Sequence, residues 1–171
     1  MRKVLIINGS GGVGKDTLVN IFQAFIPTNH ISIVQPAKNA ARCVGWNGKK
    51  TEKDRKFLSD LKTLIDEYNN YNYKYVANIA KDFLKIKSDK EKCNRLLCID
   101  MREKSQIEQA RKDFDAKVVL VTNNRVKHIT SNIADGGVFD IDYDYTIDNS
   151  GTLQELHEKA GIFLKELFKG D

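Results

Sequence analysis

One stretch near the start of the chain, Asn8-Gly9-Ser10-Gly11-Gly12-Val13-Gly14-Lys15-Asp16-Thr17, restricts the possible folds more than any other. It follows the apolar run Val4-Leu5-Ile6-Ile7 and precedes residues with helical periodicity. A glycine-rich connection between a buried strand and a helix lets several backbone N–H groups point inward around an anion, and the start of the helix adds its positive dipole end. Ordering so many small residues costs conformational entropy unless a ligand binds them. We therefore expect a strand–loop–helix unit that binds phosphate.

The spacing of the glycines fits two phosphate-binding motifs. Gly9, Gly14 and Lys15 match G-x-x-x-x-G-K-[S/T] except at the last position, where Asp16 replaces the hydroxyl residue. The same stretch also spells the dinucleotide fingerprint G-x-G-x-x-G, which requires an acidic residue about 20 positions later. After Asp16 the next carboxylate is Glu52, and a lysine directly follows the last glycine. The phosphate-loop motif is therefore favoured, with Lys15 reaching the β- and γ-phosphates of a nucleoside triphosphate.

Composition excludes several other classes of protein. A chain of 171 residues is long enough for one domain, and 41% apolar and 30% charged residues are ordinary for a globular protein. No apolar run approaches the roughly 18 residues that span a membrane, and the run after Met1-Arg2-Lys3 is too short for a secretory signal. Cys43, Cys93 and Cys98 lack a metal-binding spacing and fit a reducing compartment. We expect a cytoplasmic protein without a membrane partner, present as a monomer or a homodimer.

The net charge of +5 is modest and suits a pocket for polyphosphate anions. It also allows binding to nucleic acid. However, the basic residues are scattered and lack interleaved aromatic side chains on which bases could stack. This pattern argues against nucleic acid as a partner and favours a small phosphorylated molecule.

Alternating strands and helices indicate a single three-layer α/β/α domain over residues 1–171, with a parallel sheet covered on both faces. The apolar runs predict strands over residues 3–8, 31–34, 95–100, 118–121 and 145–147. Helices are predicted after the glycine-rich loop up to Pro27, over 37–44, from Thr51 to Tyr68, from Val76 to Ile86 after a linker at 69–72, over 104–114, near 126–133, and after Thr152. Ligands of such sheets bind at the carboxyl ends of the strands.

Two acidic side chains fall at this edge of the predicted sheet. Asp16 stands where the phosphate-loop motif has a hydroxyl ligand of Mg²⁺, and Asp100 ends an apolar strand. Carboxylate oxygens bind Mg²⁺ well, directly or through water, and the ion would offset the repulsion between Asp16 and a triphosphate. Alternatively, Asp16 complements the helix dipole and Asp100 caps the following helix. We predict that Asp16 and Asp100 are the metal ligands.

Two arginines join Lys15 as candidate catalytic cations. Arg102 lies two positions after Asp100, where a bidentate cation would stand beside the transferred phosphate. The alternative is a surface ion pair with Glu103 or with another neighbour. Arg125 begins a polar segment in the region where a phosphotransferase has lid arginines that neutralise developing charge. The alternative is that Arg125 belongs to a solvated loop.

The remaining nucleotide contacts are expected from the loop and from the end of the last strand. Thr17 offers a hydroxyl to the α-phosphate, and Asn149 lies either under the nucleotide base or in a turn. The predicted nucleotide-binding residues are Gly11, Gly12, Val13, Gly14, Lys15, Asp16, Thr17 and Asn149.

Cations gather between the second strand and the long helix, where they would bind a second phosphorylated substrate. Lys38 and Arg42 are four positions apart and therefore share one helix face. Trp46 either stacks on a base or fills the core. Each cation taken alone also fits solvated surface. The predicted acceptor-binding residues are Lys38, Arg42, Trp46 and Arg55.

Four segments carry a resemblance to a known family. The segments are Gly14-Lys15-Asp16-Thr17; Pro36-Ala37-Lys38 together with Gly45-Trp46-Asn47-Gly48-Lys49-Lys50-Thr51 and Asp54-Arg55-Lys56-Phe57-Leu58; Ile99-Asp100-Met101-Arg102; and Asp144-Tyr145-Thr146-Ile147-Asp148-Asn149-Ser150-Gly151-Thr152-Leu153. They resemble the phage-type deoxynucleoside monophosphate kinases in the nucleoside-monophosphate-kinase branch of phosphate-loop (P-loop) proteins. The last segment is also similar to the ending of dephospho-coenzyme A kinases.

This resemblance implies a P-loop NTPase fold with a five-stranded parallel sheet in the order 2-3-1-4-5. It also implies transfer of the γ-phosphate of ATP, with Mg²⁺, to a nucleoside monophosphate or a similar acceptor. Residues 36–90 would form a helical acceptor-binding region and residues 125–144 a reduced lid. A second possibility stays open, namely a regulatory protein that binds or hydrolyses a nucleotide and does not phosphorylate a small molecule.

Overall fold

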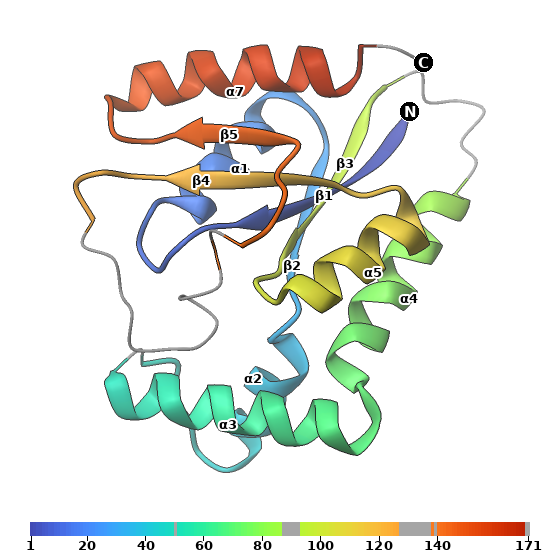
Figure 1. The fold of residues 1–171 in the computed structure, drawn as a ribbon, viewed down its shortest axis with the longest axis vertical. Helices are drawn as coiled ribbons and strands as arrows, with labels where there is room; N and C mark the ends of the chain where they lie inside the picture. Colours follow the sequence, from blue (N-terminus) through green and yellow to red (C-terminus); the bar gives the residue numbers. More distant parts are fainter. Residues whose placement is uncertain (50, 87–92, 127–137, 139, 170–171) are drawn as a thin grey trace.

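The sheet consists of five parallel strands, and the phosphate loop follows its central strand (Figure 1). The computed structural model describes residues 1–49, 51–86, 93–126, 138 and 140–169. All the strand pairings are parallel, and the order β2-β3-β1-β4-β5 confirms the expected topology. The strands are β1 (Arg2–Asn8), β2 (Thr28–Ser32), β3 (Arg95–Asp100), β4 (Lys117–Thr122) and β5 (Tyr145–Asp148).

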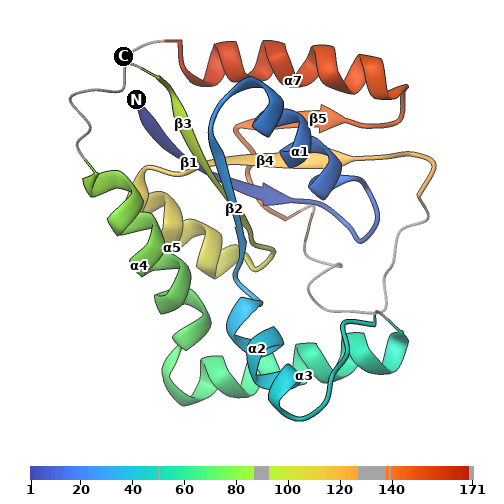
Figure 2. The same ribbon diagram turned by 180° about the vertical axis from the view of Figure 1, so that it is seen from behind.

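Helices cover both faces of the sheet, as Figures 1 and 2 show from opposite sides. Successive side chains of β1 alternate between the two faces. Val4 and Ile6 enter one core with α4 and α5, while Leu5 and Ile7 enter a second core with α1 and α7. Because β1 is buried on both faces, its apolar run is continuous. The covering helices are α1 (Lys15–Phe25), α4 (Tyr71–Lys85), α5 (Lys104–Phe114) and α7 (Leu153–Leu167).

Two further helices, α2 (Gln35–Cys43) and α3 (Glu52–Asn69), lie beyond the carboxyl end of β2 (Figure 1). Helix α3 begins with a capping box, in which Thr51 and Asp54 bind each other's backbone N–H groups. The predicted linker over 69–72 is wrong. Only Asn70 separates α3 from α4, because asparagine tolerates the left-handed conformation (φ 55°) that turns the chain there.

The second strand also differs from its prediction. It was expected over 31–34, but the hydrogen-bonded register joins Thr28 to Leu96 and Ser32 to Asp100. This strand lies at the sheet edge and is mostly half-buried, so it does not need an apolar run. Ile33, which suggested a strand, is instead buried in the core with α4 and α5 on the way to α2.

Two other predictions from the sequence concern a short helix after β4 and the absence of a membrane-spanning segment. The short helix predicted near 126–133 lies outside the described residues except for Val126. Among the helices that the structure describes, none combines the length and the apolar character that crossing a membrane requires.

Candidate functional site

The phosphate loop joins β1 to α1, and glycine is required at two of its positions. Gly9 and Gly14 have φ angles of 140° and 97°, which side-chain-bearing residues rarely adopt. A Cβ atom on Gly9 would overlap the carbonyl oxygen of Val121, and one on Gly14 would overlap the side-chain amide of Asn149. The loop backbone is therefore packed tightly against the ends of β4 and β5.

Positive charge gathers within the loop. The ammonium group of Lys15 donates to the carbonyl oxygens of Gly9 and Ser10 at 2.6 and 2.9 Å. Gly14 is the N-cap of α1, so the N-cap has no side chain that could accept hydrogen bonds from the first-turn N–H groups. These groups and the ammonium together suit an anion, as the sequence predicts for residues 11–17.

Two asparagines hold the loop in place, and the sequence did not reveal this role for either. Asn8 is fully buried; its Oδ1 accepts from the N–H of Gly9 at 2.7 Å, and its Nδ2 donates to the Tyr143 hydroxyl at 2.9 Å. Burial raises the pKa of Tyr143 to about 12, so its hydroxyl stays protonated. Asn149, predicted to lie near the base or in a turn, donates to the carbonyl oxygen of Val13 at 2.9 Å.

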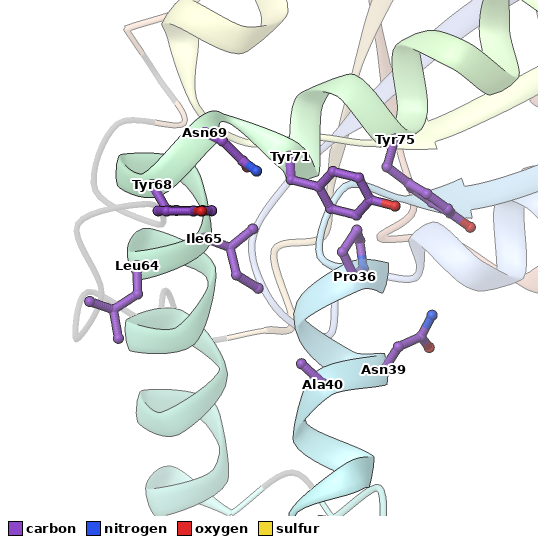
Figure 3. A pocket seen from close by; sticks show the side chains of 9 residues that line it. All are labelled: Pro36, Asn39, Ala40, Leu64, Ile65, Tyr68, Asn69, Tyr71 and Tyr75. Atoms are coloured by element: carbon purple, nitrogen blue, oxygen red, sulfur yellow. The ribbon is translucent and has the colours of Figure 1, made fainter.

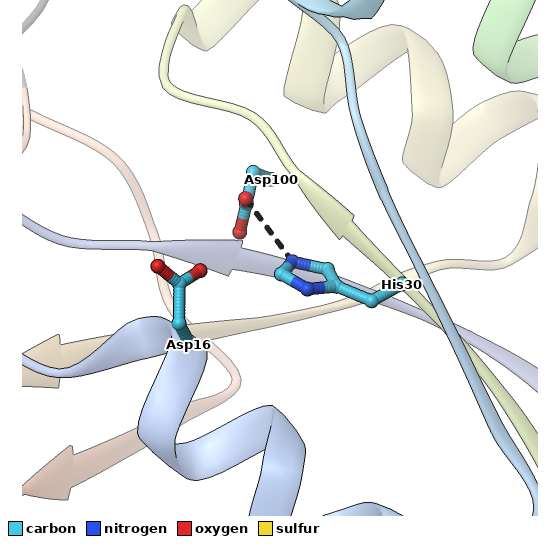
Figure 4. A group of neighbouring side chains, drawn as sticks. All are labelled: Asp16, His30 and Asp100. Atoms are coloured by element: carbon cyan, nitrogen blue, oxygen red, sulfur yellow. Dashed lines mark ion pairs between the residues drawn. The ribbon is translucent and has the colours of Figure 1, made fainter. Parts of the chain in front are cut away.

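Asp16 and Asp100 meet beside the loop, as predicted, and His30 joins them (Figure 4). Asp16 lies in the first turn of α1, His30 in β2 and Asp100 at the end of β3. In the register of the sheet, His30 stands opposite Cys98, which packs under α1, and Asp100 follows on the same face. One donor atom from each residue lies within 4.8 Å of the other two.

The charges of this cluster are only partly balanced. His30 Nε2 lies 3.1 Å from Asp100 Oδ2, and this pairing raises the pKa of His30 although burial and Lys38 act against it. Among the described residues, His30 Nε2 and Asp100 Oδ1 are buried without a hydrogen bond of good alignment. The helix-cap alternative for Asp100 is wrong, because the N-cap of α5 is Glu103. The cluster therefore keeps buried ligand atoms available to an ion.

The two predicted arginines lie in different surroundings. Arg102 is half-buried just beyond β3. Glu103, its proposed ion-pair partner, is bound by Lys62 of α3 at 2.6 Å. Arg125 is exposed, and its guanidinium donates to the carbonyl oxygen of Gly151 at 3.1 Å. This contact places Arg125 at the loop between β5 and α7.

A pocket of about 290 Å³ lies beside the loop, on the side of β4 and β5. Its walls come from the phosphate loop, the end of β4 and the β5–α7 connection. Of these, the β5–α7 connection was expected to lie either under a nucleotide base or in a turn. The lining residues are Ser10, Val13, Leu120, Val121, Thr122, Asn123, Asn124, Val126, Val138, Asp148 and Ser150.

The predicted acceptor-binding residues are spread over α2, α3 and the connection between them. Lys38 is half-buried and close enough to act on His30 electrostatically. The Arg42 guanidinium lies 5.6 Å from the ring centre of Trp46, whose indole N–H donates to the carbonyl oxygen of Lys49. Trp46 is only half-buried, so it does not fill the core. Arg55 is exposed in the first turn of α3.

A larger hollow of about 530 Å³ lies among α2, α3 and α4 (Figure 3). Tyrosines and aliphatic side chains line it, and among the described residues that line it none is charged and none belongs to the phosphate loop. It therefore does not suit a polyphosphate. The lining residues are Pro36, Asn39, Ala40, Leu64, Ile65, Tyr68, Asn69, Tyr71 and Tyr75.

No protein-family model and no curated protein matches the sequence. Solved structures do match along nearly the whole chain. A dephospho-CoA kinase from Campylobacter jejuni is 18% identical with a TM-score of 0.52, covering 99% of both chains. A shikimate kinase from Aquifex aeolicus is 10% identical with a TM-score of 0.50, covering 100% of both chains. A gluconokinase from Sinorhizobium meliloti is 15% identical with a TM-score of 0.50, covering 96% of this chain and 93% of the other.

These similarities concern backbone arrangement, since the identities are low. They agree with the strand order and with the position of the phosphate loop between β1 and α1. The chain has the three-layer fold of the P-loop kinases.

Proposed function

We propose that this protein is a P-loop phosphotransferase that transfers the γ-phosphate of ATP to a deoxynucleoside monophosphate, a nucleoside monophosphate or a similar small phosphorylated acceptor. One observation carries the proposal: the Lys15 ammonium lies inside a loop that has no side-chain cap, next to the carboxylates of Asp16 and Asp100. The P-loop kinase fold and the resemblance of four sequence segments to phage-type deoxynucleoside monophosphate kinases support it.

The loop suits the phosphates of ATP. Lys15 would exchange the carbonyl oxygens of Gly9 and Ser10 for phosphate oxygens, while the first-turn N–H groups of α1 bind further oxygens. Thr17 follows in the same turn. The pocket of about 290 Å³ beside Ser10 and Val13 would receive the base. In this arrangement Asn149 does not contact the base; it supports the loop through its hydrogen bond to the carbonyl oxygen of Val13.

Asp16 and Asp100 would hold Mg²⁺. The buried Oδ1 of Asp100 has no partner among the described side chains, and Asp16 is exposed in the first helical turn, so both oxygens suit a cation. A bound magnesium ion would neutralise part of the negative charge on the phosphates. Without a cation, the two carboxylates would repel the triphosphate that Lys15 attracts.

The acceptor would bind on the side of α2 and α3. Lys38 acts electrostatically on His30 of the acidic cluster, and Arg42 over the ring of Trp46 offers a positioned guanidinium on the same helix. An oxygen of the acceptor phosphate is already ionised, so it can form the new P–O bond, while the bond to ADP breaks, without a general base. Arg102 and Arg125 would supply further positive charge, and catalysis would consist of positioning and charge stabilisation.

The test is a coupled assay of ADP release over a panel of deoxynucleoside and nucleoside monophosphates and other phosphorylated acceptors. We expect at least one acceptor to stimulate ADP release, and Lys15→Ala to lower that rate by about 10³-fold, the size seen when a preorganised charge donor is removed. Lys165→Ala on the exposed side of α7 is the matched control and should be unchanged. Full turnover by Lys15→Ala would refute the scheme.

A second function is a nucleotide-hydrolysing regulatory protein. It is favoured by the composition of residues 125–144, which contain a single arginine, Arg125, where a kinase lid would concentrate several. The same assay separates the two functions. A regulatory protein would release ADP at a rate that no acceptor changes.

A further inference from the structure

We propose that His30 is a third metal ligand, so that the site formed with Asp16 and Asp100 binds a transition-metal ion such as Mn²⁺ or Co²⁺ in preference to Mg²⁺. The inference builds on the proposed function, which assigns the metal to the two aspartates. It concerns the identity of the ion and adds a residue that the phosphate-loop motif does not contain.

The three side chains reach one point from three separately anchored elements (Figure 4). His30 and Asp100 belong to neighbouring strands of the sheet, and Asp16 belongs to the helix packed over them. Their donor atoms lie within 4.8 Å of one another. Ligand atoms around an ion at about 2.1 Å are roughly 3 to 4 Å apart, so small side-chain rotations would complete the site.

The surroundings of the imidazole favour a ligand role. His30 Nε2 is buried and pairs with Asp100 Oδ2 at 3.1 Å without the geometry of a hydrogen bond, and a bound ion would take the place of the Nε2 proton in this pair. Asp100 Oδ1 is likewise buried without a partner among the described residues. Buried polar atoms are normally satisfied, and an ion between these two atoms would satisfy both. Lys38 opposes a cation here, but two carboxylates outweigh one ammonium group.

A nitrogen ligand changes which ion the site prefers. Mg²⁺ is a hard cation that takes oxygen ligands and keeps several waters. Imidazole binds first-row transition metals, and their affinities rise from Mn²⁺ to Co²⁺. Asp16 and Asp100 alone would accept either class of ion. His30 is therefore the residue expected to discriminate between them.

The experiment measures metal binding by the chelator-treated full chain without nucleotide. Isothermal titration should show Co²⁺ binding at least tenfold more tightly than Mg²⁺. His30→Ala should weaken Co²⁺ binding at least tenfold and change Mg²⁺ binding less than twofold. His157→Ala, which removes an exposed histidine whose ring contacts Phe25 of α1, is the matched control and should change neither.

Pulsed electron paramagnetic resonance of bound Mn²⁺ gives a second readout, and the wild type alone is enough to test it. The wild type and His157→Ala should show coupling to an imidazole nitrogen, which His30→Ala and His30→Gln should lose. Absence of this coupling in Mn²⁺-loaded wild type, or equal Co²⁺ affinity in a folded His30 variant, would overturn the inference. Failure to bind Mn²⁺ at all would also overturn it.

Nucleotide binding in Mg²⁺, measured in parallel, separates this inference from the proposed function. If ATP binds but the nitrogen coupling is missing, His30 is not a ligand and the phosphotransferase proposal stands. If the coupling is present but neither ATP binding nor acceptor-dependent ADP release is detected, the metal site stands and the phosphotransferase proposal fails.

Discussion

Helices α1 and α3 are both amphipathic, yet they are held in the molecule in very different ways. Helix α1 follows the phosphate loop and buries Leu18, Val19 and Phe22 completely against the sheet. Helix α3 is longer but contains no buried residue. Leu64 and Tyr68, which the sequence pattern places on its apolar stripe, are 61% and 87% exposed.

This difference separates a rigid part of the site from an adaptable one. Burial and tight backbone contacts fix the loop that would bind ATP. Helix α3 depends on half-buried side chains, on its capping box and on Lys62, which bridges Asp66 and Glu103. Regions with few buried apolar contacts open at low free energy, and substrate-induced closure uses such regions. The proposed acceptor region is therefore the part expected to move.

The largest expected effect compares leucine truncations in the two helices. Leu18→Ala removes a fully buried side chain and should lower the free energy of unfolding by about 2–5 kcal/mol. Leu64→Ala makes the same chemical change at a largely exposed position and should cost less than about 1 kcal/mol. Denaturant unfolding followed by circular dichroism measures both. Equal losses would mean that α3 is as firmly packed as α1.

A pair of glycine substitutions sharpens the comparison at the level of the backbone. Gly14 and Gly48 both have positive φ angles, 97° and 88°, but only a Cβ on Gly14 would overlap a neighbour, the side chain of Asn149. Gly48→Ala should cost about 1–2 kcal/mol for the conformation alone. Gly14→Ala should cost about 1–3 kcal/mol more, as overpacking does, and should weaken ATP binding. Thermal unfolding and ATP titration measure the two effects.

If the two variants are equally stable, the contact between Gly14 and Asn149 contributes nothing to the stability of the loop. Asn149→Ala, which removes the hydrogen bond to the carbonyl oxygen of Val13, tests separately whether this support affects ATP affinity.

The sequence was most informative where local chemistry determines structure. Glycines followed by Lys15 predict a phosphate loop because few other structures need that backbone freedom and that charge together. Asp100 was placed correctly at the carboxyl edge because it ends an apolar run that had to be a buried strand. The strand order came from resemblance to a family, and periodicity alone does not provide it.

What the sequence did not reveal depends on contacts between distant segments. His30 lies in an edge strand whose polar residues gave no strand pattern, so its approach to Asp16 and Asp100 follows only from the register with β3. The support of Gly9 by Asn8 and Tyr143 joins residues far apart in the chain. The apolar stripe of α3 was visible in the sequence, but the spacing of apolar residues does not predict what fraction of each side chain other elements bury.

A smaller effect is expected where the adaptable region would meet the acceptor. Arg42→Ala removes the guanidinium that stacks on Trp46, and we expect the KM for the acceptor to rise about tenfold, or about 1.4 kcal/mol, with the KM for ATP unchanged. Lys56→Ala removes an exposed cation paired with Asp60 on α3 and should leave both constants unchanged. Steady-state kinetics with each substrate varied in turn distinguishes them. A change confined to the KM for ATP would indicate that Arg42 binds the nucleotide and not the acceptor.

The smallest expected effect concerns Asp148, at the end of β5 in the rigid region. Hydrogen bonds from Ser150, together with the ammonium group of Lys159 at 3.5 Å from Oδ2, hold the pKa of this carboxyl below its ordinary value of 3.8. A carboxyl whose pKa is lower in the folded than in the unfolded state stabilises the fold above the unfolded pKa, and this contribution is lost as the pH falls through the folded pKa. Because the group is largely solvated, Asp148→Asn should cost less than about 1 kcal/mol at pH 7. The difference from wild type should shrink as the pH is lowered below 3.8, measured by urea unfolding at several pH values. A difference that grew in acid would show that the folded state raises the pKa of Asp148.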